Sequence, residues 1–171
     1  INEFNLKPKD VKKFLDRFAV SQEETKRALS IAVCDHYNHL KAEISGHEDP
    51  NYQKQNVLIL GPTGVGKTYL VKLIAELIGV PFVKADATRF SEVGYMGANV
   101  DDIIRDLVQK AGGDKDLATK GIVYVDEVDK LATQKDDRGR DVSGRGVQFG
   151  FLRLMENTDV DLNASHDIAS Q

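Results

Sequence analysis

A glycine-rich segment directly after a short apolar run constrains the fold of this chain more than any other feature. The apolar run Val57–Leu60 leads into the octapeptide Gly61-Pro62-Thr63-Gly64-Val65-Gly66-Lys67-Thr68. The pattern G-x4-G-K-[ST] turns backbone N–H groups toward a phosphate, with the lysine on the β- and γ-phosphates and the hydroxyl on Mg²⁺. A helix over Lys67–Ile78 would aim its positive N-terminus at the same phosphates. A buried strand followed by this helix favours a phosphate site over the alternative, an ordinary glycine-rich turn.

A second apolar run, Ile122–Val125, ends in two adjacent carboxylates, Asp126 and Glu127. Open α/β sheets place their ligands at the carboxyl ends of the strands, and successive side chains on a strand point to opposite sides. We therefore predict that Asp126 binds Mg²⁺ together with Thr68, and that Glu127 activates the attacking water. Solvated acidic residues after a strand are the alternative, which the phosphate motif in the same chain disfavours.

Together the two motifs predict a site for ATP or ADP with Mg²⁺. The predicted catalytic residues are Lys67 and Glu127. The residues predicted to bind the phosphates are Gly61, Pro62, Thr63, Gly64, Val65, Gly66, Lys67, Thr68 and Tyr69.

Composition argues against several other functions. The 171-residue chain has a net charge of −4 and no basic block, which argues against a nucleic-acid groove. No apolar stretch approaches the ~20 residues of a membrane span, and no signal-peptide pattern opens the chain, so we predict a cytoplasmic protein. The single cysteine, Cys34, excludes an internal disulfide. With His36 and His39 it could form a metal cluster, but a core thiol beside surface histidines is favoured.

Alternating strands and helices predict an α/β fold, a three-layer αβα parallel sheet. We place helical segments in residues 1–50 and the αβα core in 51–171. Pro8 opens a first helix, and a capping box over Ser21–Glu24 opens a second helix that runs to about Ile44. The remaining expected elements are strands at Phe82–Ala85 and Ile122–Val125 and helices at Val100–Ala111 and Val147–Glu156.

Several sequence segments resemble those of the AAA+ ATPases of the Clp/Hsp100 family. The resemblance covers nearly the whole chain, from about Phe4 to about Asp161. The segments are Val83–Thr88, Gly94–Gly97, Val125–Lys130 and Arg140–Gln148. The resemblance is greatest to ClpX-type members, because Arg140–Gln148 continues directly into the next helix without a large inserted domain. HslU-type unfoldases rank second.

The resemblance implies a hexameric ring that hydrolyses ATP, unfolds proteins and passes them through its pore to a partner peptidase, which would be ClpP-like. Tyr95 and Met96 would grip the polypeptide, and Arg138 and Arg140 would lie on a second pore loop. An exposed turn and a solvated loop are the respective alternatives. A nucleic-acid-remodelling ATPase of the same fold is the alternative function.

The resemblance also implies that Ala19 and Val20 contact the adenine. Ser21-Gln22 stands where the family has Gly-Gln, and residues 158–171 lack the basic loop that receives substrate tags. The family's sensor strand, arginine finger and small helical domain have no counterpart here. We therefore expect an incomplete sheet with unpaired strand edges and weak hydrolysis by this chain alone.

Overall fold

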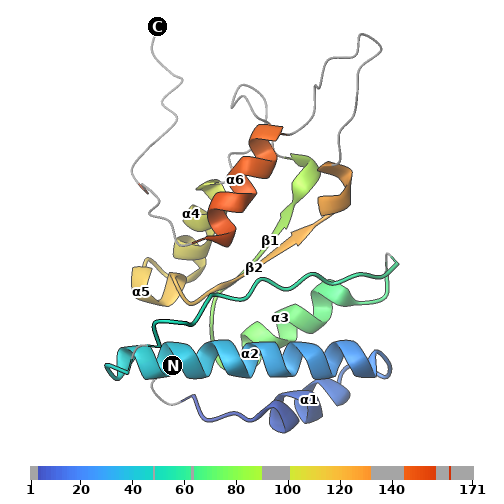
Figure 1. Ribbon diagram of the computed structural model, residues 1–171. Helices are drawn as coiled ribbons and strands as arrows, with labels where there is room; N and C mark the ends of the chain where they lie inside the picture. Colours follow the sequence, from blue (N-terminus) through green and yellow to red (C-terminus); the bar gives the residue numbers. More distant parts are fainter. Residues whose placement is uncertain are drawn as a thin grey trace, which may run out of the picture. The chain divides into compact units, whose positions relative to one another are not determined.

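The computed structural model describes residues 4–47, 49–62, 64–89, 101–131, 145–156 and 162, in two compact units (Figure 1). Unit 1 is Ile1–Gly79, and unit 2 is Val80–Gln171. The helices of unit 1 are α1 (Pro8–Asp16), α2 (Glu23–Ile44) and α3 (Lys67–Ile78). The elements of unit 2 are β1 (Phe82–Asp86), η1 (Ala87–Arg89), α4 (Asp101–Lys110), α5 (Lys115–Ala118), β2 (Ile122–Asp126), η2 (Val128–Leu131) and α6 (Arg145–Met155).

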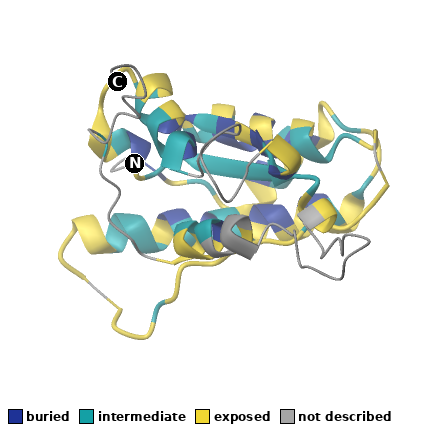
Figure 2. Cartoon of the chain, turned by 90° about the horizontal axis from the view of Figure 1, so that it is seen from above, coloured by how far each residue is buried: buried dark blue, intermediate teal, exposed yellow. Residues whose placement is uncertain are grey.

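Unit 1 is built from the apolar faces of its three helices. Helix α1 starts at Pro8, whose fixed φ suits a first helical turn. It contacts both α2 and α3. Figure 2 shows buried positions alternating with exposed ones along these helices, as a one-sided core requires. The fully buried side chains of this unit include Val11, Leu15, Cys34, Tyr37, Leu70 and Ile74. Cys34, 2% exposed, is thus the predicted core thiol.

The start of α2 differs from the prediction. The residue that caps it, Gln22, has a left-handed backbone with φ 67° and makes no side-chain cap hydrogen bond. The Gln22 carboxamide instead donates to the carbonyl of Val65, and the carboxylate of Glu23 bonds two lysines. The capping box predicted from Ser21 is therefore wrong, because Gln22 rather than Ser21 occupies the cap position and its side chain bonds Val65 instead of the first turn of the helix.

The predicted buried strand Val57–Leu60 is also wrong. These residues belong to no strand, and Val57, Leu58 and Leu60 are 53%, 71% and 82% exposed. A strand needs a ladder partner. Among the described residues the sheet has two strands, β1 and β2, and neither pairs with this run. The sheet is thus incomplete, as expected.

In unit 2, β1 and β2 form a parallel ladder whose register runs from Phe82 opposite Ile122 to Asp86 opposite Asp126. The strands predicted at Phe82–Ala85 and Ile122–Val125 are confirmed, and each is longer by one acidic residue. One face of the sheet packs against α4, α5 and α6 (Figure 1). The buried side chains of that cluster are Val83, Ala85, Ala87, Ile103, Leu107, Ala118 and Phe151.

The other face of the sheet carries the alternate residues, among them Lys84, Tyr124 and Asp126. The parallel strands and covering helices are those of the predicted α/β class. Helix α3 has the predicted bounds, α4 is one residue shorter at each end, and α6 begins two residues early. In the described part of the chain, every helix is too short or too polar to cross a membrane.

Candidate nucleotide-binding site

The phosphate loop, residues 61–68, lies in unit 1 and turns through glycines with left-handed backbones. Gly64 has φ 84° and Gly66 has φ 87°, conformations that side chains with a Cβ rarely adopt. Gly66 caps the N-terminus of α3. The first amides of a helix have no intrahelical acceptor, so this end of α3 offers N–H donors to an anion. Thr63 lies outside the described residues.

Lys67, the first residue of α3, folds back over this loop. Its Nζ donates to the carbonyl of Pro62 at 2.9 Å and to the carbonyl of Gly61. The loop is largely exposed, and both Lys67 and Thr68 are half-buried. A positive charge therefore lies over a loop whose helix end also attracts anions, and the donor set fits a polyphosphate. Tyr69 follows with an exposed side chain.

The segment between α1 and α2 contacts the same loop through Gln22, whose carboxamide donates to the carbonyl of Val65. Ala19 is half-buried, and the Val20 side chain is fully exposed. The carbonyl of Ala19 accepts a hydrogen bond of 3.2 Å from Lys26 on α2. Neither contact is encoded in a sequence motif, because only the fold brings Gln22 and Lys26 to these carbonyls.

The acidic pair lies in unit 2 at the carboxyl end of β2. Asp126 ends the strand, and its Oδ2 forms an ion pair of 2.9 Å with Nζ of Lys84 on β1. The hydrogen bond to this carboxylate is the main cause that raises the pKa of Lys84. Lys84 belongs to no sequence motif, but it lies two residues before the end of the neighbouring parallel strand, from where its side chain reaches Asp126.

Glu127 follows β2 with a left-handed backbone, φ 58°. Its N–H donates to Oδ1 of Asp126 at 3.1 Å, and its carbonyl accepts from the Lys130 N–H at 2.9 Å. A residue other than glycine with a left-handed backbone carries strain, which proteins often retain at functional sites. The chain thus holds the predicted catalytic glutamate in a conformation that its own sequence does not favour.

Residues 57–169 match the family described as "ATPase family associated with various cellular activities (AAA)". The chain belongs to this AAA family. The match includes the phosphate loop, both strands and the acidic pair. The resemblance drawn from the motifs is confirmed.

Two relatives of this AAA chain carry ClpX names. The "ATP-dependent Clp protease ATP-binding subunit ClpX 2" of Wolinella succinogenes is 42% identical over 156 residues, which cover 90% of this chain and 39% of that protein. The "ATP-dependent Clp protease ATP-binding subunit ClpX" of Bacteroides thetaiotaomicron is 43% identical over 158 residues, 91% of this chain and 38% of that protein. The chain therefore spans about two fifths of the length of these curated relatives.

The pore residues implied by the family resemblance, Tyr95, Met96, Arg138 and Arg140, lie outside the described residues. Of the two predicted metal ligands, Thr68 belongs to unit 1 and Asp126 to unit 2. A hydroxyl and a carboxylate are oxygen ligands of the kind that Mg²⁺ prefers.

His36 and His39 on α2 both contact Tyr52, in the segment that follows this helix. His36 Nδ1 lies 3.0 Å from the hydroxyl of Tyr52, and the His39 ring stacks on the Tyr52 ring. Burial is the main cause that lowers the pKa of His36. These histidines are half-buried rather than the surface residues expected. They fix the connection after α2, and in the described part of the chain no three His, Cys, Asp or Glu side chains form a metal cluster.

Proposed function

We propose that this chain is the nucleotide-binding part of a ClpX-type ATPase that unfolds proteins and threads them through a hexameric ring toward a ClpP-like peptidase. The observation that supports this most is the phosphate loop, where Gly64 and Gly66 have left-handed backbones and the Lys67 ammonium bonds the loop carbonyl of Pro62. Two relatives with ClpX names, at 42% and 43% identity, support the choice within the AAA family.

In this proposal the loop amides and Lys67 bind the β- and γ-phosphates, and Ala19 and Val20 contact the adenine. Thr68 and Asp126 would hold Mg²⁺, which when bound neutralises charge on the phosphate oxygens. Glu127 orients the attacking water and accepts its proton. General-base catalysis of this kind contributes about 10²–10⁴-fold in rate.

The polypeptide would be gripped by Tyr95 and Met96 in the pore. An aromatic ring offers contact area that does not depend on the substrate's sequence. Arg138 and Arg140 would line the second loop. A cytoplasmic location and the peptidase partner also belong to this proposal.

Nucleotide binding to this chain tests the first step. Titration with ADP and Mg²⁺ should give a saturable heat signal, which Lys67→Ala should abolish because it removes the loop's ammonium. Glu127→Gln should bind as the wild type does and hydrolyse ATP at least 10²-fold more slowly. Equal ADP binding by wild type and Lys67→Ala would refute the phosphate site.

The substrate class requires a second measurement. ATP hydrolysis by assembled rings is compared with and without an unfolded polypeptide, and with and without duplex DNA. Stimulation by polypeptide alone supports an unfoldase. Stimulation by DNA alone would instead favour a nucleic-acid-remodelling ATPase and overturn this part of the proposal.

A further inference from the structure

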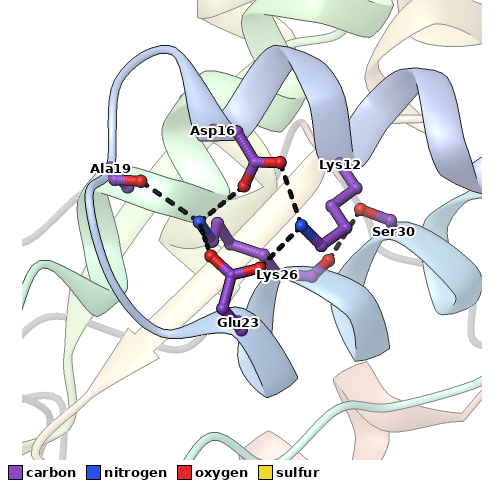
Figure 3. Close-up of polar contacts among 6 residues, drawn as sticks. All are labelled: Lys12, Asp16, Ala19, Glu23, Lys26 and Ser30. Atoms are coloured by element: carbon purple, nitrogen blue, oxygen red, sulfur yellow. Dashed lines mark hydrogen bonds and ion pairs between the residues drawn. The ribbon is translucent and has the colours of Figure 1, made fainter.

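Lys26 on α2 is a charged residue in the core of unit 1, with only 1% of its side chain exposed. Its Nζ donates to three acceptors, which Figure 3 draws together. They are Oδ1 of Asp16 at 2.6 Å, Oε1 of Glu23 at 2.6 Å and the carbonyl of Ala19 at 3.2 Å. A buried lysine is rare unless it is paired, and here all three protons have acceptors.

A second lysine bonds the same carboxylates from the other side. Lys12 Nζ lies 2.9 Å from Oδ2 of Asp16 and 2.7 Å from Oε2 of Glu23, so each carboxylate bonds both ammonium groups (Figure 3). We name these four residues, Lys12, Asp16, Glu23 and Lys26, the Lys26 network. Hydrogen bonds from the two lysines lower the pKa of Asp16, chiefly the bond from Lys26. All four groups are therefore charged at neutral pH.

The two lysines differ in one contact. Lys26 also bonds the carbonyl of Ala19, in the segment between α1 and α2, whereas the bonds described for Lys12 go to the two carboxylates. At the far end of that segment the Gln22 carboxamide donates to the carbonyl of Val65 in the phosphate loop. Residues 19–22 are thus fixed to α2 at one end and to the phosphate loop at the other.

Stability alone does not account for a lysine at this position. Burying an ammonium carries a desolvation penalty, and well-packed apolar residues often replace a buried ion pair without loss of stability. The additional property that Lys26 supplies is a fixed position for the Ala19 peptide. The exposed Val20 side chain follows directly in the chain.

We propose that Lys26 is a positioning residue for the nucleotide base: its bond to the Ala19 carbonyl sets the Ala19–Val20 surface against which the base packs. Gln22 connects that surface to the phosphate loop, so base and phosphates are recognised in one fixed geometry. The inference rests on the proposed nucleotide site and adds a residue that contacts no part of the ligand itself.

The test compares Lys26→Met with Lys12→Met in this chain. Both variants remove one ammonium from the same two carboxylates, and only the first removes the bond to Ala19. Each protein is titrated with ADP and with inorganic tripolyphosphate, which has phosphates and no base. Thermal unfolding followed by circular dichroism reports whether each variant is folded.

We expect Lys26→Met to weaken ADP binding about tenfold, equivalent to 1.4 kcal/mol. Its affinity for tripolyphosphate should stay within about twofold of the wild type, because the phosphate loop is retained. Lys12→Met should keep both affinities within about twofold. A residue that only stabilised the fold would weaken both ligands together.

The outcomes separate this inference from the proposed function. A wild-type chain that does not bind ADP overturns the proposed function. ADP binding by the wild type, with equal losses for both ligands or no loss in Lys26→Met, overturns the positioning role alone. If Lys26→Met does not fold, Lys26→Arg replaces it, because its guanidinium keeps the charge for the carboxylates but holds its donors in a planar fork that does not reproduce the geometry of the ammonium toward the Ala19 carbonyl. A folded Lys26→Arg that binds ADP like the wild type also overturns the inference.

Discussion

The left-handed backbone of Glu127 predicts stored strain at the position proposed to be catalytic. At φ 58° the Cβ of an L-residue comes too close to the following carbonyl oxygen, which costs roughly 1–2 kcal/mol. Glycine has no Cβ and avoids that cost, but it loses about 0.5–1 kcal/mol more backbone entropy on folding than alanine. Glu127→Gly should therefore be more stable than Glu127→Ala by about 0.75 kcal/mol, the difference between the midpoints of these two ranges.

Comparing the two variants isolates the backbone contribution. Both remove the carboxylate, and both keep the N–H that donates to Asp126 and the carbonyl that accepts from Lys130. The pair therefore differs mainly in the Cβ. For a chain of this size the difference corresponds to about 1–4 °C in Tm.

Urea unfolding followed by circular dichroism, with matched thermal scans, measures the difference. Hydrogen exchange of the β2 amides shows whether the gain is local to unit 2. We expect neither variant to hydrolyse ATP. A Glu127→Ala variant at least as stable as Glu127→Gly would refute the reasoning, because it would mean that no strain is relieved at this position.

Three further predictions follow from contacts in the two units. Gly121→Ala should destabilise unit 2 by about 1–3 kcal/mol in urea unfolding, because its Cβ would lie 2.6 Å from a leucine methyl of α4 and 3.0 Å from a backbone carbonyl; an unchanged midpoint would contradict this. Lys84→Met removes the ammonium 2.9 Å from Asp126, which would compete with Mg²⁺ for that carboxylate. The Mg²⁺ concentration that half-saturates ADP binding should therefore fall by up to about fivefold in calorimetry, and an equal or higher concentration would contradict this competition. The pKa of Glu23 lies below its ordinary 4.5, chiefly through its hydrogen bond with Lys12, so its contribution to stability is present above pH 4.5 and is lost as pH falls through the folded-state pKa. The stability difference between wild type and Glu23→Gln, measured by urea unfolding at several pH values, should shrink on acidification; a constant difference would refute the linkage.

The elements that the sequence predicted well are those whose signals are local. Helix α3 begins and ends where expected because Gly66 and Gly79 take left-handed conformations directly before and after it. The strands β1 and β2 were each one residue longer than predicted, because Asp86 and Asp126 continue the ladder. An acidic residue lowers strand propensity, but pairing overrides that preference.

The wrong predictions concern features that depend on partners far along the chain rather than on local sequence. Val57–Leu60 has the composition of a buried strand, yet composition cannot supply the neighbouring strand that would pair with it. Ser21 had a suitable spacing for a cap, but the bond from Gln22 to Val65 joins residues 43 positions apart. No helical or strand period encodes such a contact.

Motifs predicted the charged residues of the candidate site but not their partners within the chain. Motif spacing assigned Lys67 and Asp126 to phosphate and metal. The structure adds that the Lys67 ammonium bonds the carbonyl of Pro62, and that the carboxylate of Asp126 bonds Lys84. Sequence reasoning had no access to these contacts because they depend on rotamers and strand register.

If Lys67 and Asp126 bind nucleotide and Mg²⁺ as proposed, these internal contacts affect which ligands they select. Binding must exchange each of them for a contact with nucleotide or Mg²⁺, so only the difference between the two contributes to affinity. For Lys67 a neutral carbonyl would be exchanged for a charged phosphate, which adds the Coulomb attraction between two opposite charges to the hydrogen bond. For Asp126 a singly charged ammonium would be exchanged for a doubly charged cation. Both exchanges favour a highly charged ligand, whereas a neutral or weakly charged one gains little over the internal contacts. In the proposed function, Lys67 and Asp126 would therefore each discriminate against small ligands of low charge.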